Sequence, residues 1–289
     1  MKIGVFGLGS MGYGMAQSLL RAGHQVTGVD INPDAVARFH AEGGAAGAPS
    51  DFDAAAIVVL NAAQTRAVIE DIAPKLRKGA AVIACATVPP SFAREMGALC
   101  AGLGLHYLDA PISGGAAKAA LGKLSIMAAG TPEAFAAARP ALDAMAETVF
   151  ELGDQPGPGS AMKAINQLLA GVHIAAMAEA VTFGMTQGVD PAQTVDVISK
   201  CAGTSWMFEN RGPHIVNGDY TPHSSVNIWP KDLGIVLDIA KEAKFAAPLT
   251  AAAMQQFMAA SGSGLGLEDD AAVAKVYARN AGLTLPEGK

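Results

Sequence analysis

The chain has 289 residues, of which 51% are hydrophobic, so it is long enough for two domains with sizeable cores. Its net charge of −6 argues against a nucleic-acid partner, because nucleic-acid-binding proteins usually carry a basic face. The three cysteines, Cys85, Cys100 and Cys201, are widely spaced and form no CxxC or Cys/His pattern, so they suggest neither a disulfide framework nor a zinc site. We find no run of about 18 strongly apolar residues and no signal-peptide pattern, so we expect a cytoplasmic protein without a membrane segment.

The first half of the chain alternates short β-like runs with helical stretches. Such alternation predicts an α/β protein with a doubly wound parallel sheet. We expect strands at residues 3–6, 25–29, 56–60, 80–84, 105–109, 123–128 and 148–150.

A segment rich in glycine and proline, residues 153–159, separates this region from one without strand-like runs. We therefore expect an N-terminal domain at residues 1–158 and an all-helical domain at residues 159–289. The helices of the second domain are predicted at residues 160–187, 191–201, 231–243, 248–261 and 269–280.

A glycine motif follows the first predicted strand and opens into a helical pattern. Its residues are Gly7, Leu8, Gly9, Ser10, Met11 and Gly12. The first glycine permits a tight turn, the second lets the backbone approach a phosphate, and the third lets the helix pack on the strand. Asp30 ends the second strand, where an acidic side chain can bind the ribose hydroxyls of a dinucleotide and repel a 2′-phosphate. The pattern predicts NAD rather than NADP, although a strand-to-helix turn that binds nothing has the same glycines.

Lys163, Asn166 and Gln167 lie three and four positions apart, so on a helix they share one face and can contact one small molecule. A lysine acts as a base only when burial or a nearby positive charge lowers its pKa, and Lys231 is a candidate for that second charge. The alternative is an ordinary solvated helix face.

The loop from Asp109 to Gly115 follows another predicted strand, at the sheet edge where α/β proteins bind ligands. Ser113 and the N–H groups of Gly114 and Gly115 could hold a carboxylate, although the loop is equally compatible with a structural turn. Thr87 also follows a strand end and could contact a cofactor or initiate a helix. The histidines His173, His214 and His223 are not spaced as metal ligands, so we expect no metal.

Taken together, these segments resemble the β-hydroxyacid dehydrogenase family, which includes 3-hydroxyisobutyrate dehydrogenases and 6-phosphogluconate dehydrogenase. The likeness covers essentially the whole chain. It is carried by residues 7–16, residues 109–115, residues 157–159 with Lys163 and Asn166, and residues 231–233.

The resemblance implies a Rossmann domain, a helical domain, an active site in the cleft between them, and hydride transfer between NAD and a short hydroxy acid. It implies that Lys163 is the catalytic residue, that Ser113, Gly114, Gly115, Asn166 and Gln167 bind the substrate, and that Gly7 to Gly12, Asp30, Thr87 and Lys231 bind the cofactor. It also implies a homodimer or homotetramer. Gln167 departs from the family pattern, which usually has a second asparagine there, and Lys118 stands where a small residue is more usual.

Within the family, residues 60–65, 225–234 and 268–273 are most similar to L-threonate dehydrogenases and 2-hydroxy-3-oxopropionate reductases. Asn61, Gln64, His173, Gln167 and Asn227 offer polar groups for the hydroxyls of a sugar acid. Tartronate semialdehyde and 3-hydroxyisobutyrate remain alternative substrates.

Two other functions fit parts of the pattern. A 6-phosphogluconate-like oxidative decarboxylase would need basic residues for a phosphate, and residues 201–211 offer only Arg211. A non-catalytic nucleotide sensor would leave the motifs at Ser113 and Lys163 without a purpose.

Overall fold

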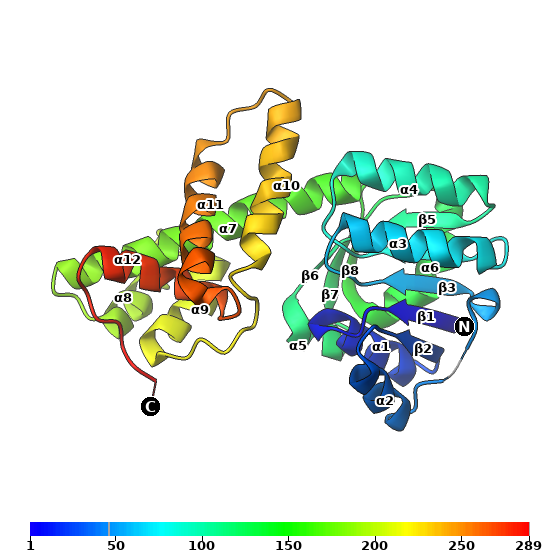
Figure 1. The fold of residues 1–289 in the computed structure, drawn as a ribbon, viewed down its shortest axis with the longest axis horizontal. Helices are drawn as coiled ribbons and strands as arrows, with labels where there is room; N and C mark the ends of the chain where they lie inside the picture. Colours follow the sequence, from blue (N-terminus) through cyan, green and yellow to red (C-terminus); the bar gives the residue numbers. More distant parts are fainter. Residues whose placement is uncertain (46, 289) are drawn as a thin grey trace. The chain divides into compact units, whose positions relative to one another are not determined.

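The computed structural model describes residues 1–45 and 47–288 and is drawn in Figure 1. The chain divides into two compact units, Met1–Lys163 and the chain from Ala164 onward. The long helix α7, Pro158–Thr186, passes from the first unit into the second. The domain boundary predicted after residue 158 stays a prediction.

The first unit contains a five-stranded parallel sheet with the strand order β2-β1-β3-β4-β5. Every residue of β3 and β4 is buried, because helices cover both faces of the sheet. The expected doubly wound fold is thereby confirmed. The strands are β1 Lys2–Phe6, β2 Gln25–Val29, β3 Ala54–Ile57, β4 Ala81–Ala84 and β5 His106–Asp109.

Two apolar clusters form the core of this unit. One packs α1, α2 and α6 against one face of the sheet, and the other packs α3 and α4 against the opposite face (Figure 1). The helices of the unit are α1 Ser10–Arg21, α2 Pro33–Ala41, α3 Ala62–Ile72, α4 Pro90–Gly102, α5 Gly115–Leu121 and α6 Pro132–Met145.

The strands predicted at residues 123–128 and 148–150 belong to a second, three-stranded sheet. Its strands are β6 Ile112–Ser113, β7 Leu124–Ala128 and β8 Ala146–Glu151. β6 pairs with β7 in the antiparallel sense, whereas β7 and β8 are parallel. The sequence did not predict β6, because a strand of two residues is too short to show an alternating pattern.

The described residues of the second unit form helices, turns and one isolated bridge, but no strand. An all-helical second domain is therefore confirmed. Beyond α7, its helices are α8 Pro191–Ile198, α9 Trp206–Asn217, α10 Ile228–Glu242, α11 Pro248–Ala260 and α12 Ala274–Asn280.

Helix α9 was not predicted from the sequence, because Pro213 lies inside it and usually interrupts a helical pattern. The ends of the helix compensate. The Ser205 hydroxyl accepts the N–H of Phe208, and Gly218 ends the helix in the left-handed conformation.

Helix α7 is long and apolar enough to cross a membrane by length and composition alone. In the apolar window that passes this test, 44% is buried inside the protein. The helix also carries Ser160 and Lys163, whose side chains make polar contacts within the first unit. These contacts favour a core helix over a membrane span.

Candidate active site

The glycine turn after β1 has the backbone that a dinucleotide phosphate requires. Gly7 has a φ of +101°, and a Cβ there would overlap the carbonyl of Val58. A Cβ at Gly12 would overlap the carbonyl oxygen of Gly7, so Gly12 lets α1 pack closely against the turn. A Cβ at Gly9 would meet no other atom within 4 Å. The fold itself does not need a glycine at this position, and the open space beside the N-terminus of α1 fits a bound pyrophosphate.

The carboxylate of Asp30 lies beside the turn. Its Oδ2 accepts the N–H of Leu8 at 2.6 Å, and its Oδ1 accepts the N–H of Asn32 at 2.8 Å. Ser10 and Met11 form the first turn of α1 nearby. Each carboxylate oxygen can accept two hydrogen bonds, so Asp30 can link these two loops and still bind a ribose hydroxyl.

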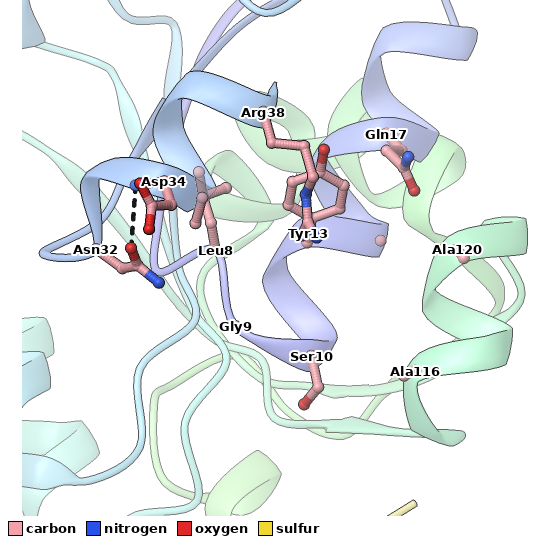
Figure 2. A pocket seen from close by; sticks show the side chains of 12 residues that line it. Leu8, Gly9, Ser10, Tyr13, Gln17, Asn32, Asp34, Arg38, Ala116 and Ala120 are labelled. Carbon is pink, nitrogen blue, oxygen red and sulfur yellow. Dashed lines mark hydrogen bonds between the residues drawn. The ribbon is translucent and has the colours of Figure 1, made fainter. Parts of the chain in front are cut away.

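A pocket of about 530 Å³ lies beside the turn and is drawn in Figure 2. Arg38 stacks over the ring of Tyr13, with its guanidinium carbon 3.9 Å from the ring centre. The pocket is lined by Leu8, Gly9, Ser10, Tyr13, Gly14, Gln17, Asn32, Asp34, Ala35, Arg38, Ala116 and Ala120. Arg38 adds a positive charge to this wall that the sequence did not predict, because Arg38 lies beyond the residues that directly follow Asp30.

A buried carboxylate anchors the start of α7. Asp109 ends β5 and is 1% exposed. Its Oδ2 accepts the N–H groups of Gly157 and Ser160, each at 2.9 Å, and its Oδ1 accepts the Ser160 hydroxyl at 2.6 Å. Burial raises the pKa of Asp109, and the hydrogen bonds from Ser160 and Gly157 oppose that rise. The end of β5 thereby holds the helix that carries Lys163.

Lys163 lies about one helical turn after this anchor and is 8% exposed. Its Nζ donates a hydrogen bond to the carbonyl of Ile112, at the start of β6, over 2.9 Å. Ser113 ends β6, and Gly114 and Gly115 follow with φ values of +135° and +76°. The first unit therefore brings the amine of Lys163 to the strand that leads into the predicted substrate loop.

Thr87 is half-buried and lies beyond the C-terminal end of β4. Helix α4 has Pro89 as its N-cap and no side-chain cap, so Thr87 does not cap it. Cofactor binding by Thr87 stays a prediction.

In the second unit, Asn166 and Gln167 on α7 connect with Lys231 and Asp232 on α10. The Asn166 Nδ2 donates to Gln167 Oε1 at 2.8 Å, and the Gln167 Nε2 donates to Asp232 Oδ2 at 2.5 Å. The Lys231 ammonium pairs with Asp232 Oδ1 at 2.7 Å. The carboxylate of Asp232 therefore joins three of the predicted site residues. Asp232 itself was not predicted as a site residue, because the sequence shows it only as the neighbour of Lys231.

Other polar residues considered for substrate hydroxyls are used within the fold. Asn61 caps α3 by accepting the N–H of Gln64, and Gln64 Oε1 accepts the N–H of Leu60. The Asn227 Oδ1 accepts the Ser261 hydroxyl at 2.7 Å. These contacts explain the polar residues by helix capping and packing, so they do not by themselves indicate a sugar-acid site.

Arg211, the basic residue weighed for a phosphate site, is 7% exposed and already paired. Its Nε donates to Asp270 Oδ1 at 2.6 Å, and Asp269 lies 3.8 Å away. The other carboxylate oxygen of Asp270 accepts the indole N–H of Trp229 at 2.9 Å. A buried arginine satisfied in this way does not favour the decarboxylase alternative.

His214 and His223 lie with Asp269, which is distant from them in sequence, so that the ligand atoms of the three residues fall within 4.8 Å of one another. His214, the backbone of His223 and Asp269 nevertheless make hydrogen bonds within the protein. His214 Nδ1 lies 2.9 Å from the carbonyl of Asp219, and Asp269 accepts the N–H groups of His223 and Ala271. The absence of a metal stays a prediction.

Comparison with known proteins places this geometry in a family. Residues 2–153 match the family profile of the NAD-binding domain of 6-phosphogluconate dehydrogenase, and residues 157–277 match the NAD-binding profile of NADP-dependent 3-hydroxyisobutyrate dehydrogenase. The chain belongs to the β-hydroxyacid dehydrogenase family. It is consequently an NAD-dependent hydroxyacid dehydrogenase.

Relatives within the family match nearly the full length. An L-threonate dehydrogenase of Cupriavidus necator is 51% identical over 99% of this chain and 98% of its own length. One of Escherichia coli K12 is 45% identical over 99% of this chain and 97% of its own length. A solved structure from Salmonella typhimurium, described as a 3-hydroxyisobutyrate dehydrogenase, is 48% identical with a TM-score of 0.89, covering 96% of this chain and 99% of that one. These relatives confirm the family resemblance and the similarity to L-threonate dehydrogenases.

Proposed function

We propose that this enzyme oxidises L-threonate with NAD. The observation that carries the proposal is the 51% identity to an L-threonate dehydrogenase over nearly the whole of both chains. The four linked polar residues of α7 and α10 support it, because a sugar acid needs more hydrogen-bonding partners than a methyl-bearing acid.

In this proposal, the glycine turn and Asp30 hold NAD, which supplies a hydride acceptor when bound. Lys163 takes the proton of the substrate hydroxyl at Nζ. Its hydrogen bond to the Ile112 carbonyl supports this role, because it fixes the amine beside the loop of Ser113, Gly114 and Gly115. That loop binds the substrate carboxylate through its hydroxyl and N–H groups.

A substrate panel tests the proposal. Reduction of NAD is followed by absorbance with L-threonate, D-glycerate and 3-hydroxyisobutyrate, and the reverse reaction is followed with tartronate semialdehyde. The proposal predicts that L-threonate has the highest kcat/KM. A higher value for any other acid would reassign the substrate, and a preference for 3-hydroxyisobutyrate would support the second candidate, suggested by the description of the Salmonella structure.

Lys163→Ala tests the catalytic assignment. We expect kcat to fall at least about 100-fold, as for the loss of a general base, while NAD binds with nearly unchanged affinity. The steady-state rate of NAD reduction is measured for each variant, and NAD affinity is measured by fluorescence quenching. The control is Lys123→Ala, which replaces an exposed lysine of the same unit. Equal loss of turnover and NAD binding would show that Lys163 supports the fold or the cofactor instead.

A homodimer or homotetramer in the cytoplasm belongs to the same proposal. Large apolar side chains exposed on α7 and α11 support association, among them Ile165, Leu169, Phe183 and Leu249. Light scattering of the purified protein gives the mass, and a monomer at micromolar concentration would contradict this part of the proposal.

A further inference from the structure

Gln167, which was predicted to bind the substrate, makes its side-chain hydrogen bonds within the second unit. Both ends of its amide are used inside the second unit, where Oε1 accepts from Asn166 and Nε2 donates to Asp232. The residue is also 7% exposed. Its longer side chain thus links a neighbour on α7 to a carboxylate on α10.

The carboxylate determines the direction of every hydrogen bond in this chain of groups. The Lys231 ammonium pairs with Asp232 at 2.7 Å, and a carboxylate paired with a cation acts as an acceptor of hydrogen bonds. Gln167 must therefore present its NH₂ group to Asp232 and its carbonyl oxygen to Asn166. Asn166 in turn must present its NH₂ group to Gln167, which fixes the orientation of an amide that could otherwise rotate by 180°.

In this orientation, the side-chain carbonyl oxygen of Asn166 is the atom that can accept a hydrogen bond from a bound ligand. Within residues 1–45 and 47–288, the structure shows no hydrogen bond to this oxygen. An acceptor in this position selects a ligand that offers a hydroxyl, since a methyl group has no proton to donate.

The two helices are held close enough for the link to form. At Gly171, one turn after Gln167, a Cβ would approach the side chains of Leu233 and Trp229 to within 3 Å. Trp229 stacks on Phe257 and donates its indole N–H to Asp270, so the start of α10 is anchored on its other side as well. The distance from Gln167 to Asp232 is therefore set by packing and does not depend on the polar contact alone.

We propose that Gln167 and Asp232 are positioning residues that fix Asn166 as a hydrogen-bond acceptor for a hydroxyl of a polyhydroxy acid. This inference rests on the proposed function for the substrate class. In it, Gln167 acts on the substrate indirectly, by orienting the amide of Asn166. It also gives a physical reason for the glutamine that replaces the usual second asparagine. An asparagine is one methylene shorter, so it has less reach than Gln167 between Asn166 and Asp232.

A double-mutant cycle between Gln167 and Asn166 tests the proposal. Gln167→Met keeps the length of the side chain without its polar atoms, and Gln167→Asn is a second, smaller variant that keeps an amide. Gln193→Met, on the exposed surface of α8, is the matched control. KM and kcat are measured for the acid of the panel that the wild type oxidises best, and KM is measured for NAD.

We expect either Gln167 variant to raise the KM for the acid about tenfold, the effect of one ordinary hydrogen bond, with kcat and the KM for NAD within about twofold of wild type. In the Asn166→Ala background the same change should have little further effect, because Gln167 would have no amide left to orient. Asp232→Asn, which can donate as well as accept, should also raise the KM for the acid.

Full additivity of the Gln167 and Asn166 effects would overturn the proposal, and so would an unchanged KM in both Gln167 variants. Because the cycle uses whichever acid the wild type prefers, its outcome is separate from that of the substrate panel. If the preferred acid carries only one hydroxyl, the proposed function fails even when the residues are coupled.

Discussion

Asp30 illustrates how one side chain can serve both the fold and the ligand. Its two oxygens accept the N–H groups of Leu8 and Asn32, so it joins the glycine turn to the loop after β2. The negative charge held there opposes a 2′-phosphate. Arg38, on the wall of the neighbouring pocket, would favour the same phosphate if Asp30 were absent.

Asp30→Ala should therefore weaken NAD binding and relax the discrimination against NADP. Loss of charge-assisted hydrogen bonds of about 1.5–3 kcal/mol corresponds to a rise in the KM for NAD of roughly 10- to 100-fold. The ratio of kcat/KM for the two cofactors is the measurement. Asp34→Ala removes a charge from the neighbouring pocket without altering the turn and serves as the control. If the ratio of kcat/KM for NAD and NADP were unchanged in Asp30→Ala, Asp30 would not contact the ribose.

At the residue scale, the sequence located the glycines of the turn because each meets a local backbone requirement. It could not assign Asn61 and Gln64, since an amide that caps a helix and one that binds a ligand look alike in sequence. Nor could it show that Gln167 is bonded to Asp232, because those residues are 65 positions apart.

At the scale of elements, different glycines of the turn between β1 and α1 serve folding and cofactor binding. Gly12 is confined by the carbonyl of Gly7, whereas Gly9 faces open space. Gly9 also has a φ of −69°, which any residue can adopt. Substitution of these two glycines should therefore have different consequences.

Gly12→Ala should lower the free energy of unfolding by about 1–3 kcal/mol, because the added methyl group must displace backbone. Gly9→Ala should change it by less than about 0.5 kcal/mol but weaken NAD binding, because the methyl group occupies the space for the phosphates. Denaturant unfolding followed by far-UV circular dichroism and NAD titration measure the two effects. A stable Gly12→Ala with full NAD affinity, or a Gly9→Ala that binds NAD normally, would contradict this assignment.

The elements that the sequence predicted are those with a strong local pattern. The buried strands β1, β2, β4 and β5 were found within one or two residues, and the alanine-rich α7 was found at nearly its full length. β6 and α9 were missed, because a two-residue strand and a helix with an internal proline are stabilised by pairing and capping rather than by periodicity.

At the scale of the whole molecule, the second unit is organised around a buried ionic network. Asp270 binds both Arg211 and Trp229, and Asp269 lies next to it in the sequence. Burial raises the pKa of Asp270 to about 6, with Arg211 opposing and Asp269 adding to the shift. The network therefore makes the stability of this unit dependent on pH.

The sign follows from the raised pKa. Between about pH 4 and pH 6 the folded unit retains a proton on Asp270 that the unfolded chain releases, so this residue contributes less stability as the pH rises. The difference in unfolding free energy between wild type and Asp270→Asn should therefore decline over that range and level off above it. Both tryptophans, Trp206 and Trp229, lie in this unit, so tryptophan fluorescence during urea unfolding reports on it.

Asp219→Asn is the control with the opposite sign. Hydrogen bonds from Thr221 lower the pKa of Asp219, so its contribution is present at neutral pH and is lost as the pH falls through its folded pKa. A difference between wild type and Asp270→Asn that stayed constant or increased with pH would rule out the proposed role of Asp270.

The sequence by itself determined the fold class, the cofactor turn and the family, because these depend on local periodicity, on the conformational needs of glycine and on motifs in a fixed order. The tertiary structure decided which polar residues act together. Asp109 with the start of α7, Arg38 with Tyr13, and Gln167 with Asp232 are all pairs distant in sequence. Such contacts arise only when strands end at a shared edge or helices pack closely, so no pattern of neighbouring residues could have predicted them.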